Sequence, residues 1–99
     1  DGWTPLMFAA GDSSTPEIVA LLIEKGAELE AKSTDGWTPL MYAARNSSTP
    51  EIVALLIEKG AEVNARNTDG VTPLMYAARN PWGKRAEIIQ LLYDAGATE

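Results

Sequence analysis

The chain has 99 residues, of which 45% are hydrophobic and 22% charged, a composition that is ordinary for one globular domain. Its net charge of −6 argues against nucleic acid or an anionic membrane as the partner, and no apolar run approaches the roughly 20 residues that span a bilayer. The chain contains no histidine and no cysteine, so the commonest catalytic bases, nucleophiles and soft-metal ligands are missing.

A repeat of 34 residues organises the sequence. Asp-Gly-Trp-Thr-Pro-Leu-Met opens at Asp1 and returns at Asp35, and Asp-Gly-Val-Thr-Pro-Leu-Met follows at Asp69. Self-similarity at such a period is typical of a solenoid, in which each unit buries its apolar face against its neighbours. We therefore predict a single domain over residues 1–99, built from units 1–34, 35–68 and 69–99.

Within the middle unit, a turn and a short helix come first. Asp35-Gly36 is a turn signal, because glycine accepts the positive φ that tight turns need. Thr38 and Pro39 then predict a helix start, with the threonine as N-cap and the proline at the first helical position. The predicted helix covers residues 39–44, and its alanines favour close packing between helices.

A second helix is predicted after the loop at residues 46–48. It begins at Pro50 with Thr49 as N-cap, or alternatively with Ser48 and Glu51 forming a capping box. Gly60 is the expected C-terminal stop. Residues 61–68 then form an extended connection to the next turn. An apolar stripe at helical spacing is predicted to be core, formed by Ile52, Val53, Leu55, Leu56 and Ile57.

These features resemble the ankyrin repeat across all three units. The resemblance rests on Thr-Pro-Leu at 4–6, 38–40 and 72–74, Ala-Ala at 9–10, 43–44 and 77–78, Leu-Leu at 21–22, 55–56 and 91–92, Gly-Ala at 26–27, 60–61 and 96–97, and Val-Asn-Ala at 63–65. It implies an all-α fold, an ankyrin-type helix-loop-helix solenoid with β-turn fingers.

The chain departs from the family pattern at several positions. Met7, Met41 and Met75 replace a histidine that hydrogen-bonds back to the threonine, so we expect that polar contact to be lost. Glu30 replaces an asparagine, so we expect the first finger to be less firmly held. The third unit has a longer loop at residues 80–85, whose Trp82 we expect to fold onto its own unit.

The first two units are nearly identical. They differ at 7 of 34 positions, which are 8, 11, 12, 29, 30, 32 and 33 of the first unit. The identity extends to loop residues that packing does not dictate. We interpret the chain as an engineered repeat protein or as a fragment excised from a longer array.

We predict no catalytic, cofactor or metal site. The acidic pairs Asp12 with Glu17 and Glu28 with Glu30 are more typical of solvated charge than of paired catalytic carboxylates. Glycine-rich phosphate motifs are also absent from the sequence.

The resemblance instead implies a protein partner, bound on the concave face of finger tips and first helices. The matching positions are Trp3, Asp35, Trp37, Arg45, Asn46, Asp69, Val71, Arg79 and Asn80, with Gly11, Asp12, Ser33, Thr34, Asn67 and Thr68 beside them. Tryptophan and arginine are enriched at binding hot spots. The alternative is a structural role, in which each tryptophan packs on the next finger and Arg45 pairs with Asp35 or Asp12.

We therefore predict a non-catalytic protein–protein interaction module or an engineered scaffold. The alternative is a structural repeat protein with no biological partner that associates head to tail through its ends. The apolar residues expected to be uncovered are Met7 and Phe8 at one end and Ile88, Leu91, Leu92 and Tyr93 at the other. The sequence predicts no cellular compartment.

Overall fold

The computed structural model describes residues 2–11 and 16–98, which form six helices and no strand. The helices are α1 (Pro5–Gly11), α2 (Pro16–Glu24), α3 (Pro39–Asn46), α4 (Pro50–Glu58), α5 (Pro73–Ala77) and α6 (Arg85–Asp94). The prediction of an all-α repeat fold is therefore confirmed.

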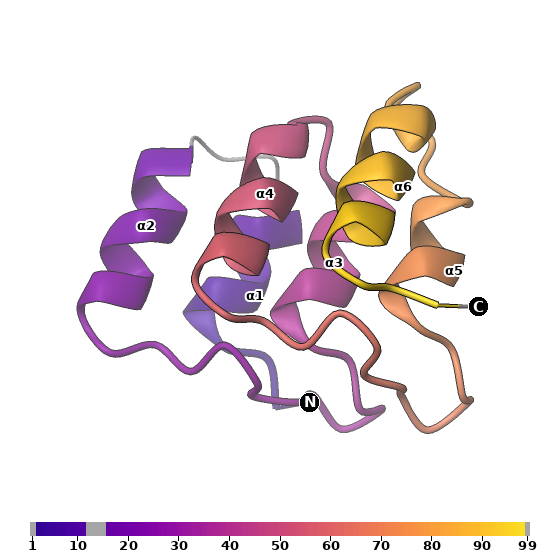
Figure 1. Ribbon diagram of the computed structural model, residues 1–99. Helices are drawn as coiled ribbons and strands as arrows, with labels where there is room; N and C mark the ends of the chain where they lie inside the picture. Colours follow the sequence, from indigo (N-terminus) through magenta and orange to yellow (C-terminus); the bar gives the residue numbers. More distant parts are fainter. Residues whose placement is uncertain (1, 12–15, 99) are drawn as a thin grey trace.

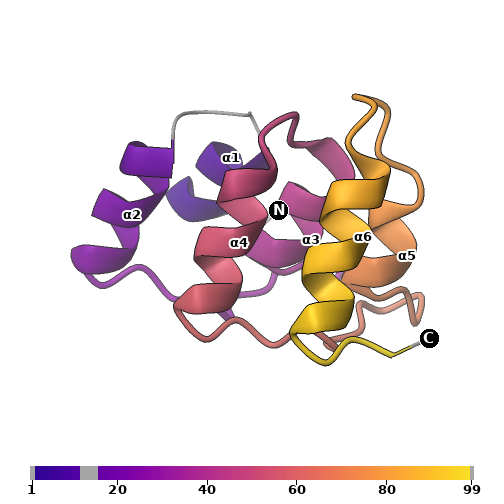
Figure 2. The same ribbon diagram turned by 45° about the horizontal axis from the view of Figure 1, so that its top comes forward.

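The helices lie in two rows. Helices α1, α3 and α5 pack side by side behind α2, α4 and α6, as Figures 1 and 2 show. The connections that carry the Asp-Gly turns lie along the lower side in Figure 1, and the loops between α3 and α4 and between α5 and α6 lie on the opposite side. The core runs between the rows, and its largest fully buried side chains include Leu6, Met7, Leu40, Met41, Ile52, Leu56, Ile88 and Leu92.

Helices α1, α3 and α5, which form the inner row, each begin at the predicted threonine and proline. The Thr38 hydroxyl accepts a hydrogen bond from the Met41 N–H at 3.3 Å. In return, the Met41 sulfur accepts from the Thr38 N–H at 3.5 Å, and the Met7 sulfur accepts from the Thr4 N–H at 3.4 Å. The expected loss of a polar contact is therefore wrong at Met7 and Met41, where the thioether, although a weak acceptor, reaches the threonine N–H. At Met75 the helix start has only the bond from the Met75 N–H to the Thr72 hydroxyl.

Of the two predicted starts for the second helix, the one at Thr49 is right. Thr49 is the N-cap of α4, and the neighbouring Ser47 hydroxyl accepts its N–H at 3.0 Å. The predicted stop at Gly60 is also confirmed. Gly60 has a φ of +106°, and the following Ala61 N–H donates to the Leu56 carbonyl at 3.0 Å, which is a Schellman motif.

The second and third Asp-Gly turns are hydrogen-bonded both within themselves and to each other. The Gly36 N–H donates to the Ser33 carbonyl at 2.9 Å and closes a four-residue turn. Thr68 from the next turn donates its N–H and its hydroxyl to the Asp35 carbonyl, at 3.1 and 3.0 Å. Both bonds end on the Asp35 carbonyl and hold these two neighbouring turns side by side.

The expectation that the first finger is less firmly held with Glu30 than with an asparagine agrees with the hydrogen bonds, because Glu30 makes one link to the next connection and Asn64 at the corresponding position makes two. The Glu30 carboxylate accepts the Glu62 N–H at 2.7 Å and so links two neighbouring connections. Asn64 makes the corresponding link to the last connection, donating to the Gly96 carbonyl at 3.2 Å and accepting the Thr98 N–H at 2.9 Å. A carboxylate cannot donate as the amide does, so Glu30 links the two connections by one charge-assisted bond where Asn64 uses two.

Two expectations about exposed apolar residues need correction. Trp82 does not fold onto its own unit: it lies in the turn at residues 81–83 and is 59% exposed. Met7 is fully buried, as are Ile88 and Leu92, while Phe8 and Tyr93 are exposed as expected and Leu91 is partly buried. The methionine faces the following helix pair, so the uncovered methionine is Met75 at the other end.

Candidate protein-binding face

A continuous row of aromatic rings crosses the inner side of all three helix pairs. We call Phe8, Trp3, Tyr42, Trp37 and Tyr76 the aromatic row, in the order in which they touch. Successive ring centroids lie 4.8, 4.1, 4.7 and 4.1 Å apart. Each tryptophan therefore bridges the aromatic ring of its own pair and the ring of the next pair, and packs the pairs together.

Polar groups from the turns fix the two tyrosines. The Asn67 amide donates to the Tyr76 hydroxyl at 2.7 Å, while its oxygen accepts the N–H groups of Asp69 and Val71 at 3.0 and 2.9 Å. One side chain therefore shapes the turn and positions the ring. Burial raises the pKa of Tyr42 above its ordinary value; a hydrogen bond with Ser33 acts in the opposite direction, and the charge of Asp35 adds to the rise.

Two arginines lie on this face. The Arg79 guanidinium carbon lies 5.6 Å from the centre of the Tyr76 ring, within cation–π range, and so extends the aromatic row. Arg45 lies in the last turn of α3, where a cation is favourable for the helix dipole. Within the described residues Arg45 makes no ion pair with Asp35, and a pairing with Asp12 lies outside them.

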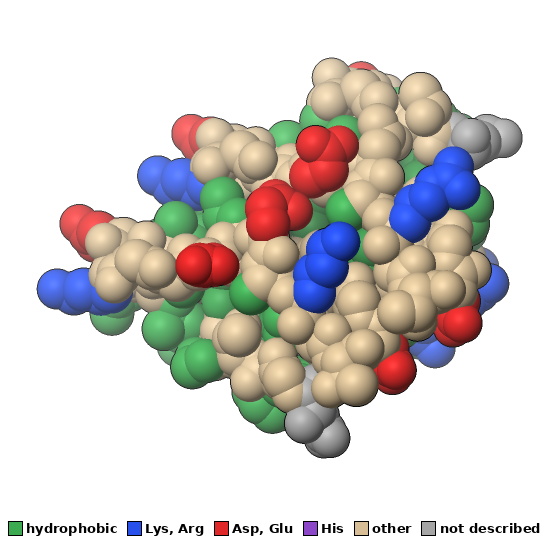
Figure 3. Space-filling model, turned by 90° about the horizontal axis from the view of Figure 1, so that it is seen from below, with side chains coloured by type: hydrophobic (Ala, Val, Ile, Leu, Met, Phe, Trp, Pro, Cys, Tyr) green, Lys and Arg blue, Asp and Glu red, His purple; other side chains and the backbone are tan. Residues whose placement is uncertain are grey.

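The structure brings most of the predicted binding residues to this side. Asp35 and Asp69 are exposed at the turn tips. Trp3 is exposed within the aromatic row, and Arg79 is exposed beside it. The predicted residues that are partly buried there are Trp37, Arg45, Asn46 and Val71, together with Gly11. Viewed from the side of the turns, Figure 3 shows acidic and basic side chains interspersed, with hydrophobic side chains gathered toward the end that carries the first helix pair.

The placement of Asn80 on the accessible face is wrong. Asn80 is fully buried, and its amide donates to the carbonyls of Ala44 and Ser47, both at 2.9 Å. Its oxygen accepts the Trp82 N–H at 2.9 Å. These three bonds hold the loop between α5 and α6 against the preceding helix pair.

Three members of the aromatic row are not among the residues predicted to bind a partner. Phe8, Tyr42 and Tyr76 occupy the same position of the repeat, and each is aromatic. An aromatic residue at one position in every unit, five residues after a tryptophan in two of them, is the signal that was available. A tyrosine that precedes the two helical alanines is also typical of a core position, so this signal does not by itself indicate a binding surface.

The described residues contain neither a metal-binding group nor a membrane-spanning helix. In the ranges 2–11 and 16–98, no three acidic side chains come together in a group that could hold a metal ion. In the same ranges, no helix is long and apolar enough to cross a membrane.

Stacked helix pairs with linked turns and an open face define a helical repeat protein of the solenoid class, whose surface rather than an enclosed cavity is offered to a ligand. A family model described as ankyrin repeats, three copies, matches residues 1–67 and again residues 30–98. The chain therefore belongs to the ankyrin repeat family. Ankyrin repeats are generally protein–protein interaction modules and are typically non-catalytic. A comparison with curated proteins finds no match.

Proposed function

We propose that the chain binds a protein partner through the concave face that carries the aromatic row and the linked turns. The observation that carries this proposal is the aromatic row itself. Its accessible rings, those of Phe8, Trp3 and Trp37, rest on the buried rings of Tyr42 and Tyr76 or on one another, so they lose little conformational freedom when a partner covers them. Backbone bonds between the turns hold the neighbouring surface in place.

The chemistry of this face favours a particular kind of partner segment. Trp3 and Trp37 offer apolar area, and the guanidinium groups of Arg45 and Arg79 can hold a carboxylate with two parallel hydrogen bonds. The proposed partner therefore presents an exposed apolar residue close to an aspartate or glutamate. The acidity of the whole chain does not oppose this, because the charges on this side are mixed.

A display library of random peptides, selected on the immobilised chain, tests the proposal. We expect the selected peptides to combine an apolar residue with Asp or Glu. For such a peptide, Arg45→Ala should lose about 1–3 kcal/mol of binding free energy and reduce its salt dependence. Trp37→Val should lose a similar amount, and valine is a mild replacement because Val71 occupies the corresponding position.

Glu58→Ala is the matched control. Glu58 is exposed near the end of α4, in the other row of helices, so its replacement should leave binding unchanged within about 0.5 kcal/mol. Urea unfolding of each variant shows that it remains folded. If Glu58→Ala weakens binding more than Trp37→Val does, the partner uses the outer helices and the proposed face is wrong.

As a second candidate we propose an engineered structural repeat protein that has no biological partner and associates with itself. The near identity of the first two units favours this candidate, and so do the exposed apolar side chains Phe8 and Met75 at opposite ends of the stack. Sedimentation at rising concentration tests it, since the mean mass should increase with concentration. A monomer at every concentration would contradict it.

A further inference from the structure

The N-terminal end of the stack exposes residues that are buried in the second and third helix pairs. Phe8 is 59% exposed, whereas Tyr42 at the corresponding position is 5% exposed. Ile18 is 48% exposed, whereas its counterpart Ile52 is completely buried. This side of a helix pair is therefore one that a preceding pair covers.

The C-terminal end exposes the other side of a helix pair. Met75 is 38% exposed, whereas Met41 at the corresponding position is completely buried. Ala78 is exposed as well, whereas Ala44 is buried. This side of a pair is one that a following pair covers.

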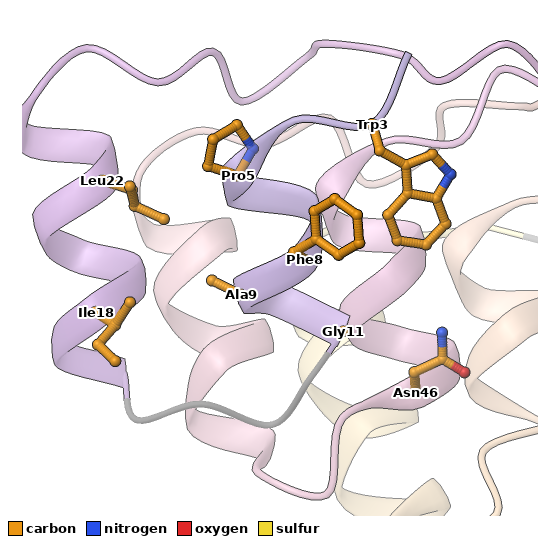
Figure 4. Close-up of a pocket in the computed structure, with 8 residues that line it drawn as sticks. All are labelled: Trp3, Pro5, Phe8, Ala9, Gly11, Ile18, Leu22 and Asn46. Atoms are coloured by element: carbon orange, nitrogen blue, oxygen red, sulfur yellow. The ribbon is translucent and has the colours of Figure 1, made fainter. Parts of the chain in front are cut away.

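Both ends are hollowed as well as apolar. Figure 4 shows the N-terminal hollow, of about 600 Å³, in which Ile18 and Leu22 on α2 point toward α1 and the rings of Phe8 and Trp3 lie side by side. The C-terminal hollow, of about 330 Å³, is lined by Met75, Ala78 and Ile89 among others. The two ends of one chain thus carry the two halves of the contact that the chain makes twice within itself.

We propose that the occupant of each end is a second copy of this chain, stacked in the register of the internal contacts as if it were the next helix pair. This inference rests on the self-association proposed above and adds its geometry. The contact is heterologous, N-terminal end against C-terminal end, and it leaves a free end on each copy, so it propagates into open chains.

The internal contacts also predict which residues meet. A Cβ built on Gly11 lies 3.4 Å from the Cβ of Tyr42 in the next pair. The residues at the same repeat positions across the proposed contact are Arg79 of one copy and Phe8 of the next. Arg79, which already lies over the Tyr76 ring, would then continue the aromatic row into Phe8 of the second copy.

A mixing experiment tests the polarity of the contact. Phe8→Glu places a charge on the N-terminal end, and Met75→Glu places one on the C-terminal end. Because both side chains are exposed, both variants should fold, which circular dichroism melts check. We expect each variant alone to sediment as a monomer and an equimolar mixture to form a 1:1 dimer, since one intact pair of ends remains. If Met75→Glu associates by itself, the contact joins two N-terminal ends and the proposal is wrong.

A cross-linking experiment tests the register. Because the chain contains no cysteine, a thiol-reactive cross-linker reacts only with the cysteines that are introduced. A mixture of Phe8→Cys and Arg79→Cys chains should give covalent dimers with a short thiol-reactive cross-linker. A mixture of Phe8→Cys and Glu58→Cys chains should give at least tenfold less. A Gly11→Cys, Tyr42→Cys double variant is the positive control, because its two sites face each other within one chain.

The results separate the two proposals. If the unmodified chain stays monomeric at hundreds of micromolar, self-association itself is wrong. If the chain associates but Phe8→Glu associates equally well, or the pair 8 and 79 does not cross-link, self-association stands and the proposed register is wrong.

Discussion

Gly36 and Gly70 have the same place in the repeat and nearly the same backbone, but different surroundings. Their φ angles are +82° and +77°, a region that disfavours any residue with a Cβ. A Cβ on Gly36 would lie 3.0 Å from the Thr68 nitrogen and 3.1 Å from the Asn67 Cα, whereas one on Gly70 would have nothing within 4 Å. The first glycine serves both the turn and the contact between turns, and the second serves the turn alone.

We therefore expect Gly36→Ala to destabilise the chain more than Gly70→Ala. The backbone strain of about 1 kcal/mol is common to both changes. At Gly36 the methyl group also meets the backbone of the next turn, which should add roughly 1–3 kcal/mol. Urea unfolding monitored by circular dichroism measures both losses. Equal losses would mean that the turns do not pack against each other in solution.

Single residues also mark where the sequence stops predicting the structure. Thr38 and Pro39 were predictable because a helix cap is a local arrangement that neighbouring residues determine. The bond from the Thr38 N–H to the Met41 sulfur was not, because the family pattern has histidine there and sulfur is a poor acceptor. Asn80 was assigned to the surface because nothing local shows that its amide reaches carbonyls of the preceding helix pair.

At the scale of elements, the third helix pair differs from the first two because its internal loop is longer. Helix α5 ends at Ala77, earlier in its repeat than α3 does, and α6 begins only at Arg85. Lys84, the N-cap of α6, makes no capping bond through its side chain. The buried Asn80 side chain therefore takes over the task of fixing this loop.

Asn80→Ala should cost about 2–4 kcal/mol of unfolding free energy. The change removes two donors from the buried carbonyls of Ala44 and Ser47, and an unsatisfied buried polar group costs about 1–3 kcal/mol. Asn46→Ala is the control, because Asn46 has the same place in the second unit but is only partly buried. It should change stability by less than about 1 kcal/mol. A larger effect at Asn46 than at Asn80 in thermal or urea unfolding would show that the loop is not held in this way.

Apolar periodicity predicted the helices better than it predicted their neighbours. The stripe on α4 identified Ile52 and Leu56 as core, and both are completely buried. The same periodicity does not say whether the preceding or the following pair covers a given side chain. For that reason the expectation that Met7 is uncovered at the N-terminal end is wrong. The burial of Met7 and the exposure of Met75 show that the following helix pair covers this methionine position.

At the scale of the whole molecule, the aromatic row shows how one repeated contact joins the units. The Trp3 ring meets Tyr42 at 4.1 Å, and the Trp37 ring meets Tyr76 at the same distance. Val71 interrupts the pattern in the third unit, where Arg79 lies over Tyr76. In such a stack, the free energy of unfolding is close to the sum of the stabilities of the units and of the contacts between neighbouring units. A core residue in a unit with two neighbouring units therefore contributes more to stability than one in an end unit.

Leu56 and Leu22 test this additivity, because they have the same place in the repeat. Leu56 is completely buried in the middle unit, whereas Leu22 is only partly buried at the N-terminal end. Leu56→Ala should cost roughly 2–5 kcal/mol, the range for a leucine removed from a packed core, and Leu22→Ala should cost clearly less. Guanidinium unfolding, with the slope of free energy against denaturant checked for each variant, measures both. Since small domains have only about 5–15 kcal/mol of stability, the Leu56 variant should be partly unfolded well before the Leu22 variant. Equal or reversed losses would mean that the ends are as well covered as the middle, which contradicts a stack held together by contacts between neighbouring units.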